Sequence, residues 1–462
     1  MRQTRRDISW SVREGTANSI MVGIGETYLP AFVLAMGLGQ TASGLIVTIP
    51  LLAGAVIQLI SPLAVTAIGS HKKWVVGCAL VQACVFLGLA IAAIAGTIGT
   101  TAAFLLASIY WACGMAGGSA WNTWITTLIP ERIRTRFFST RGRWIQGSTM
   151  MAFIVAGLAL KVAQDSDAKA TTNATDLAAN HLLTTFAVLF VIAFAARIAS
   201  AAMLAQKSEP VPLPPHQRQV SMAQLFMRLR RSSDGKLILY LVCAQAATQV
   251  AAPFFTPFML RQMNLDYGTY TALVATAFMG RVLFLPLLGR QVEKYGANKL
   301  LLACGVAMAP MAVLWVVAYD NLPALFFLQV LSGVVWGGFE LASSLLIYER
   351  VIPAERTSIL TTYNLSHASA LVIGSLVGGV VLEAMGESFQ GYLVIFALSS
   401  ILRTLTITLL LPAAQHGVHA EVRPLRGTRV PRLPRAARES ALREHGTPAA
   451  PEPKSWPHRD AG

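Results

Sequence analysis

The sequence predicts an all-α membrane protein whose twelve transmembrane helices form two pseudo-symmetric bundles of six. Three observations predict this fold class: an apolar composition, the recurrence of long apolar segments, and an internal repeat. Of the 462 residues, 54% are hydrophobic and 13% are charged, and the mean hydropathy is +0.56. These values lie outside the range of soluble domains. A membrane span needs about 20 apolar residues to cross a hydrocarbon core of about 30 Å.

Twelve apolar segments are arranged around one central linker. The N-terminal bundle is predicted at residues 15–205 and the C-terminal bundle at 237–411. Residues 1–14 precede them as a short basic segment, and a Pro- and Arg-rich linker at 206–236 separates them. Residues 412–462 are predicted to be a disordered basic tail, because they lack apolar periodicity. The predicted spans cover residues 15–38, 43–68, 74–95, 101–129, 144–162, 182–205, 237–259, 269–288, 300–318, 324–348, 365–385 and 391–411.

The distribution of positive charge predicts the orientation in the membrane. The formal net charge is +15, and most lysines and arginines fall in the termini, the linker and alternate loops. The other loops hold only Lys161, Lys169 and Arg261 as basic residues. By the positive-inside rule, both termini face the cytoplasm of a plasma or inner membrane. Topology thus explains the charge, and nucleic-acid binding is not expected.

The two halves of the sequence repeat at an offset of 223 positions. Three landmarks share that offset, and each is a proline or glycine in a corresponding apolar segment. Their agreement predicts duplicated six-helix halves. The pairs are Pro30 with Pro253, Pro130 with Pro353, and Gly114 with Gly337.

A short polar segment lies between the eighth and ninth spans. Residues 289–296 read G-R-Q-V-E-K-Y-G, in which two glycines bracket an acid–base pair. We expect a tight turn in which both glycines allow close backbone approach and positive φ. The charged side chains would then pair across the turn. The residues of this predicted gating turn are Gly289, Arg290, Glu293, Lys294 and Gly296.

This pattern, the twelve spans, the central linker and the repeat together resemble the major facilitator superfamily of secondary transporters over residues 15–411. The corresponding loop of the first half, residues 69–73, keeps a glycine and basic residues but lacks the acid. The resemblance implies two bundles that rock about a cavity at the membrane midplane. It also implies that helices 1, 4, 7 and 10 line the cavity and that the charged turn stabilises one closed state.

Glu26 lies near the middle of the first span, within the sequence G-I-G-E-T-Y. A carboxylate at the centre of a span is unfavourable by about 2.5–3.5 kcal/mol on insertion scales, so it must face protein or water. Two interpretations remain: a proton-coupling carboxylate, or a hydrogen-bonded structural acid. Its repeat partner is Gln249, which cannot titrate. Any proton chemistry at this pair therefore belongs to the N-terminal half.

Arg281 in span 8 and Glu340 in span 10 are a second candidate pair inside the membrane. They would form a buried ion pair that either holds the second bundle together or breaks during a transport cycle. Their spacing in the sequence does not establish a direct contact. Two further basic residues, Arg197 in span 6 and Arg403 in span 12, are expected to extend toward the cytoplasmic face.

Aromatic and amide side chains in spans 4 and 7 suggest a solute site. Trp121, Asn122 and Trp124 lie close together in span 4, and Gln245 and Gln249 share one face of span 7. Indole rings beside amide groups suit a ring-shaped or amphipathic solute. The alternative for the tryptophans is anchoring at the membrane interface.

These observations predict a secondary active transporter of a small organic solute that works by alternating access. Coupling to protons through Glu26 is expected, with assistance from Glu340, and export is slightly favoured over uptake. The sequence has no nucleotide-binding loop, no metal-ligand spacing and no nucleophile triad, so we expect no enzyme activity, cofactor or metal. The expected partners are a solute, protons and the lipid bilayer, with the chain acting as a monomer. The alternative is a receptor or scaffold that works through its basic linker and tail.

Overall fold

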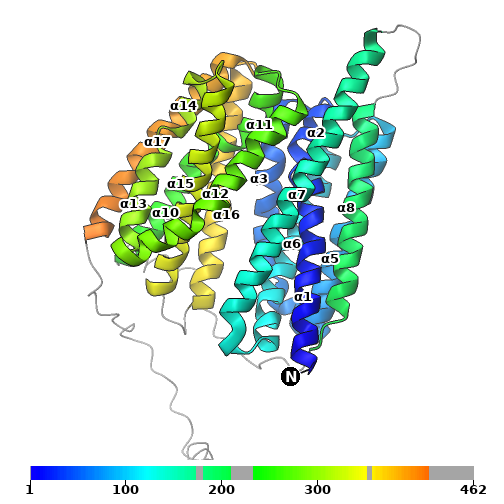
Figure 1. Cartoon of the computed structure of the whole chain (residues 1–462), viewed down its shortest axis with the longest axis vertical. Coiled ribbons are helices and arrows are strands. Elements are labelled where there is room, and N and C mark those ends of the chain that lie inside the picture. The colour runs from blue at the N-terminus through cyan, green and yellow to red at the C-terminus, as the bar shows by residue number, and fades with distance from the viewer. Residues whose placement is uncertain (1, 173–180, 210–232, 351–355, 416–462) are drawn as a thin grey trace, which may run out of the picture. The chain divides into compact units, whose positions relative to one another are not determined.

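The computed structural model describes residues 2–172, 181–209, 233–350 and 356–415 (Figure 1). Within these ranges the regular structure is helical and contains no strand. The N-terminal half contains α1 (Arg2–Met21), η1 (Val22–Glu26), α2 (Leu29–Ala35), α3 (Gln40–Gln58), α4 (Ser61–Ile68), α5 (His71–Ala95), α6 (Thr100–Leu128), α7 (Glu131–Thr172) and α8 (His181–Ala205). The C-terminal half contains α10 (Ser233–Gln249), η2 (Ala252–Phe254), α11 (Phe255–Pro257), η3 (Phe258–Gln262), α12 (Tyr267–Tyr295), α13 (Ala297–Met308), α14 (Met311–Val317), α15 (Leu322–Arg350), α16 (Arg356–Ala384) and α17 (Phe389–Gln415).

The helices confirm the predicted fold class. Within the described residues, eleven helical segments are long and apolar enough to cross a membrane, and each overlaps one of the predicted spans 2 to 12. The first predicted span is helical too, but it is divided among α1, η1 and α2. This span is not among the eleven segments. Its longest helix, α1, begins at Arg2 and includes the charged N-terminal residues. Residues 2–14 therefore continue into the first span as one helix.

The first helices of the two halves are interrupted at corresponding places. In the N-terminal half the π-helical turn η1 ends at Glu26, and Pro30 lies in the first turn of α2. In the C-terminal half α10 ends at Gln249, and Pro253 lies in the first turn of η2. Proline is tolerated in a first helical turn because the N–H that it lacks has no partner there. The structure thus shows the repeat at the offset that the sequence predicts.

Helix α12 continues through the predicted gating turn. Because α12 ends at Tyr295, Gly289, Arg290, Glu293 and Lys294 lie in its last two turns, and only Gly296 has a positive φ, +87°. The prediction of a tight turn that begins at Gly289 is therefore wrong. Arg, Gln, Glu and Lys favour helix and extend it past the apolar segment. Among the described residues, no ion pair involves any of these charged side chains.

Other predicted boundaries also shift. Helix α7 has 42 residues, about 63 Å at 1.5 Å per residue, so it extends beyond both ends of the predicted span 144–162. Residues 206–209 of the predicted linker are described, and its last residues belong to α10. Residues 210–232, and the tail after residue 415, lie outside the described residues.

Within the described residues, the apolar core joins the two halves at one end of the helices only. We call the end that holds the N-terminus the inner end and the opposite end the outer end. Toward the outer end a single cluster includes Phe32 and Phe153 of the first half and Phe254 and Phe258 of the second. Toward the inner end each half has its own cluster. Helix α3 packs against α16, and α7 against α12 (Figure 1).

Candidate functional site

Glu26 lies where the first helix is interrupted. It is the last residue of η1, and its side chain is half-buried. The hydroxyl of Tyr110, a buried residue of α6, donates a hydrogen bond to the Glu26 carboxylate. The Thr27 hydroxyl donates a hydrogen bond to the Val22 carbonyl oxygen at 3.0 Å. This bond gives a backbone acceptor of the π-helical turn an additional donor. Such turns occur frequently at functional sites.

Two glycines allow this turn to lie deep in the N-terminal bundle. A Cβ atom at Gly25 would lie 2.3 Å from the Phe86 ring of α5, and one at Gly23 would lie 2.5 Å from the Thr149 carbonyl oxygen of α7. Only a residue without a side chain permits approaches this close. The sequence G-I-G-E therefore holds Glu26 between neighbouring helices.

The amide pair of the second half occupies the corresponding position. Gln245 and Gln249 lie on the last turn of α10, and both are half-buried. A Cβ atom at Gly374 of α16 would lie 2.1 Å from the Ala246 carbonyl oxygen and 3.0 Å from the Gln249 Cβ. Close packing of α16 thus fixes the backbone that carries both amides, and neither amide can ionise near neutral pH.

Arg281 of α12 and Glu340 of α15 form an ion pair. The spacing in the sequence left this contact open, and the structure supplies it through close helix packing. A Cβ atom at Gly333 would lie 2.0 Å from the Ala277 carbonyl oxygen, and one at Gly337 would lie 3.0 Å from Arg281 Cγ. The side chains of Arg281 and Glu340 are 34% and 48% exposed. The expectation of a buried pair is therefore wrong, because both side chains are partly accessible in this conformation.

This exposure limits the contribution of the pair to stability. Solvent-exposed ion pairs typically contribute about 1 kcal/mol or less. We expect Glu340→Gln to lower the unfolding temperature of the purified protein by less than about 3 °C, measured by thermal unfolding in detergent. The control is Glu293→Gln, which changes an exposed carboxylate on α12. A fall of about 10 °C for Glu340→Gln alone would contradict a half-exposed pair.

The aromatic residues of α6 are covered in this conformation. Trp124 is 1% exposed, and its Nε1 donates to the Ser208 carbonyl oxygen at 3.0 Å. The guanidinium of Arg141 lies 4.3 Å from the ring centre of Trp121. Asn122 is exposed. Trp124 therefore offers no surface to a solute here, contrary to the expectation, because the beginning of the central linker folds back over it.

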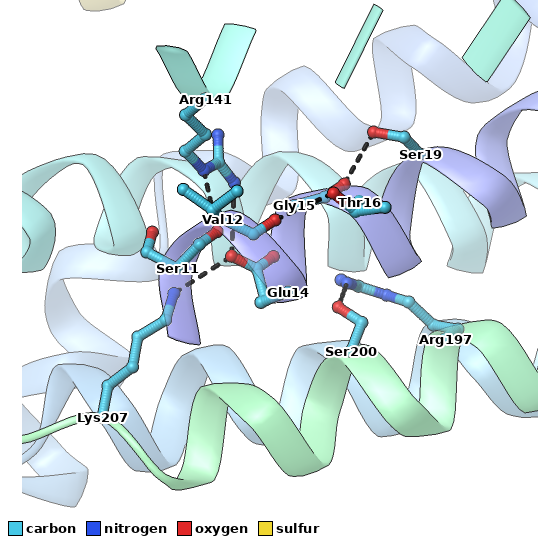
Figure 2. Close-up of polar contacts among 10 residues, drawn as sticks. All are labelled: Ser11, Val12, Glu14, Gly15, Thr16, Ser19, Arg141, Arg197, Ser200 and Lys207. Carbon is cyan, nitrogen blue, oxygen red and sulfur yellow. Dashed lines mark hydrogen bonds and ion pairs between the residues drawn. The ribbon is translucent and has the colours of Figure 1, made fainter. Parts of the chain in front are cut away.

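Figure 2 shows a group of charges at the inner end of the N-terminal bundle, which we call the inner cluster. It consists of Glu14, Arg141 and Lys207. Glu14 Oε2 lies 3.2 Å from Arg141 Nη2 and 3.0 Å from Lys207 Nζ. The side chains of Glu14 and Lys207 are 6% and 0% exposed. Two cations thus share one carboxylate in a buried site.

The linker residues next to Lys207 extend these contacts across the bundle. The backbone N–H and the hydroxyl of Ser208 both donate to the Asp7 carboxylate, at 3.0 and 2.6 Å. The Glu209 carboxylate accepts from the Ser70 hydroxyl and the Lys72 backbone N–H. Sequence reasoning did not identify this arrangement, because Glu14 and Lys207 lie outside the predicted spans. The available signal was an acid, Glu14, and a base, Lys207, each bordering an apolar segment.

A buried contact joins the bundles toward the outer end. The Tyr28 hydroxyl lies 2.7 Å from Thr271 Oγ1 and 3.0 Å from the Phe153 carbonyl oxygen. Tyr28 is 0% exposed and Thr271 is 3% exposed. A Cβ atom at Gly157 of α7 would lie 2.0 Å from Thr271 Oγ1 and 2.4 Å from the Tyr28 hydroxyl. Gly157 is therefore a point of close approach between α7 and α12.

A carboxylate makes a second contact at the outer end. Glu387 precedes α17 and accepts hydrogen bonds from the backbone N–H groups of Gln40 and Thr41, at 3.1 and 2.7 Å. Burial would raise the pKa of the Glu387 carboxyl, but these donors at the N-terminus of α3 outweigh it and lower the pKa below 4.5. The carboxylate therefore stabilises this contact fully above pH 4.5, and that stabilisation is lost only as the pH falls through the lowered pKa.

Comparison with known proteins supports the architecture. A sequence model of the Major Facilitator Superfamily matches residues 237–449. Over 207 residues the chain is 26% identical to Solute carrier family 67 member A1 of Homo sapiens, and the match covers 43% of this chain and 48% of that protein. The matched region thus spans about half the length of that relative.

Two solved structures extend the similarity to both halves. A mutant of the nucleoside transporter NupG has a TM-score of 0.66 at 14% identity, over 87% of this chain and 99% of its own. The chain has the Major Facilitator Superfamily fold. A bacterial homologue of the iron transporter ferroportin, in an inward-facing state, has a TM-score of 0.65 at 12% identity, over 90% of this chain and 99% of its own. The resemblance predicted from the sequence is confirmed.

Proposed function

We propose that this chain is a secondary active transporter that moves a small organic solute by alternating access. The observation that carries the proposal is the division of the apolar core: one cluster joins both bundles toward the outer end, and two separate clusters lie toward the inner end. Such an arrangement closes the outer side and leaves the inner ends of the bundles free to move. Both structural neighbours are named as transporters, or as a homologue of one, which supports transport, and the nucleoside transporter also supports an organic solute.

Proton coupling is the second part of the proposal. Glu26 is half-buried at a helix interruption and has one described hydrogen-bond donor, Tyr110. A carboxylate with a single neutral partner and partial access to water can bind and release a proton as the surrounding helices move. Gln249 occupies the corresponding position in the second half, so the proposal assigns coupling to the N-terminal bundle alone.

The direction of transport does not form part of the proposal. The sequence favoured export only slightly, because an aromatic cavity in α6 would suit either export of amphipathic compounds or uptake of a sugar or organic acid. In this conformation Trp124 is enclosed, and Arg141 covers Trp121. Candidate polar groups that remain accessible include Asn122, the amides of α10 and the Arg281–Glu340 pair. They favour a solute with several hydrogen-bonding groups over a purely apolar one.

The alternating-access claim is testable by distance measurements between spin labels. Thr97 and Asn321 are exposed positions at the outer end, and Lys73 and Lys294 are exposed positions at the inner end. Labels would be placed in a variant that lacks the five native cysteines, after a check that its thermal unfolding is unchanged. Solutes that raise the unfolding temperature would then be added. We expect the outer distance to lengthen while the inner distance shortens. If both label distances stay unchanged with every solute that raises the unfolding temperature, the proposal is contradicted.

A receptor or scaffold is the rival function. It would work through the linker and tail, most of which lie outside the described residues. The part of the linker that the structure describes, Lys207 to Glu209, is bonded to the N-terminal bundle. This observation favours a structural role for the beginning of the linker.

A further inference from the structure

Two helices that begin at the outer end present their first backbone N–H groups to the opposite half of the protein. Helix α3 of the first half begins at Gln40, and helix α12 of the second half begins at Tyr267. The first N–H groups of a helix have no acceptor within the helix itself. Where other helices cover such groups, the acceptors must come from outside the helix.

Glu387 of the second half supplies the acceptors for α3. Its Oε2 accepts from the Gln40 backbone N–H at 3.1 Å, and its Oε1 accepts from the Thr41 backbone N–H at 2.7 Å. Gly39, at the N-cap position of α3, has no side chain that could accept these bonds. Carboxylates are among the preferred N-cap groups. Glu387 therefore provides the cap that α3 lacks, across the boundary between the two halves.

Gln164 of the first half makes the matching contact to α12. Its Oε1 accepts from the Tyr267 backbone N–H at 3.0 Å. Helix α12 also has an N-cap of its own, because the Asp266 carboxylate accepts from the backbone N–H groups of Gly268 and Thr269. Gln164 thus accepts from the first N–H of the helix. It makes one hydrogen bond with a neutral oxygen, whereas the Glu387 carboxylate accepts two.

The internal repeat relates these two acceptors. The step from position 164 to position 387 is 223 residues, which is the offset between the halves. Gln164 lies in α7, just beyond the apolar segment of the fifth span, and Glu387 follows α16, just beyond the eleventh. Each half therefore presents an acceptor from the same position of its fold to a helix N-terminus of the other half.

The backbone at Glu387 has an uncommon conformation. Its φ is +52°, in the left-handed region that residues other than glycine adopt rarely. The Gln262 Nε2 donates to the Glu387 carbonyl oxygen at 2.9 Å and so holds this turn. Such conformations persist where surrounding contacts fix them, and they are frequent at segments that switch between two arrangements.

We propose that Glu387 and Gln164 are reciprocal outer latches: each caps a helix of the opposite half while the outer end is closed, and each releases that helix when the outer end opens. The inference rests on the proposed function, because a latch requires an outer end that opens. Hydrogen bonds to a charged acceptor are roughly twice as strong as those between neutral groups. Glu387 is therefore the stronger latch.

The test measures how often the outer end opens, in the absence of any solute. A cysteine would replace Leu45 in a variant without the five native cysteines. Leu45 of α3 packs against the cluster that joins the halves, and a Cβ atom at Gly379 of α16 would lie 3.4 Å from its side chain. A membrane-impermeant maleimide, added on the outer side, would label this cysteine when the bundles part. We expect Glu387→Ala to raise the labelling rate about fivefold and Gln164→Ala about twofold.

The matched control is Glu383→Ala, which removes an exposed carboxylate of α16 and should leave the labelling rate unchanged. Glu387→Gln should give a rate between those of the wild-type protein and Glu387→Ala, because the amide keeps one acceptor oxygen. An equal rise in rate with Glu383→Ala would overturn the inference.

A positive control separates the latch from the proposed function. Gly157→Ala adds a methyl group that would overlap Thr271 where α7 meets α12, so it forces the bundles apart without touching either latch. If it raises the labelling rate and neither latch variant does, the latch is overturned and the proposed function stands. If neither Gly157→Ala nor any stabilising solute changes the rate, the outer end does not open, and the proposed function fails together with the latch.

Discussion

Replacement of Glu26 by glutamine is expected to reduce the accumulation of solute driven by a pH gradient at least tenfold, while exchange of solute across the membrane continues. Glutamine has nearly the same shape and can still accept the hydrogen bond from Tyr110. It cannot bind and release a proton. The loss should therefore affect coupling and not folding, and an unchanged unfolding temperature would confirm that separation. The measurement is uptake of a radiolabelled solute into proteoliposomes with and without an imposed pH gradient.

The control for this experiment is Glu383→Gln. Glu383 is an exposed carboxylate in α16, near the outer end. This variant should accumulate solute as the wild-type protein does. Normal pH-driven accumulation by Glu26→Gln would remove Glu26 from the coupling mechanism. That result would favour the alternative interpretation of Glu26 as a hydrogen-bonded structural acid.

The second large effect is expected for Gly157→Ala. The added methyl group would overlap Thr271 and the Tyr28 hydroxyl, at 2.0 and 2.4 Å, and both residues are buried between the bundles. Overpacking of this kind typically costs about 1–3 kcal/mol. Separation of α7 and α12 at the outer end would relieve it. We therefore expect the ratio of outward-open to inward-open protein to rise roughly tenfold, seen as a longer distance between labels at Thr97 and Asn321.

A matched control lies on the same helix. A Cβ atom at Gly147 of α7 would meet nothing within 4 Å. Gly147→Ala should therefore leave the distance distribution unchanged, although both substitutions add one methyl group to α7. An unchanged distribution in Gly157→Ala, with a normal unfolding temperature, would show that the outer contact adapts without opening.

Sequence reasoning predicted the fold well because its signals were local and repeated. Apolar segments of about 20 residues are sufficient to identify spans, and prolines at a constant offset marked the corresponding helix interruptions. The predicted ends of the spans were wrong where polar residues continued a helix beyond the apolar segment. Residues 289–295 favour helix by composition, so the glycine at 289 did not end it. The inner ends of α1 and α7 were missed for the same reason.

The candidate site could be predicted only in part. Glu26, Arg281 and Glu340 were identifiable because charged residues inside apolar segments are rare. Their degree of exposure and the cover over Trp124 depend on contacts between residues far apart in the chain. Glu14 and Lys207 are separated by 193 positions, and no local pattern connects them. Arg197 and Arg403 were expected to extend to the cytoplasmic face, but both side chains are buried in the bundles, which also depends on contacts between distant residues.

The most direct test of the central claim is counterflow in proteoliposomes. Vesicles loaded with an unlabelled solute that stabilises the protein would be diluted into a trace of the same solute in radiolabelled form. Wild-type protein and a chain that ends at residue 415 would be compared. Our account predicts transient accumulation of label with both chains, because the bundles alone perform the movement. The absence of counterflow with wild-type protein, for every solute that it demonstrably binds, would contradict the account and favour a receptor.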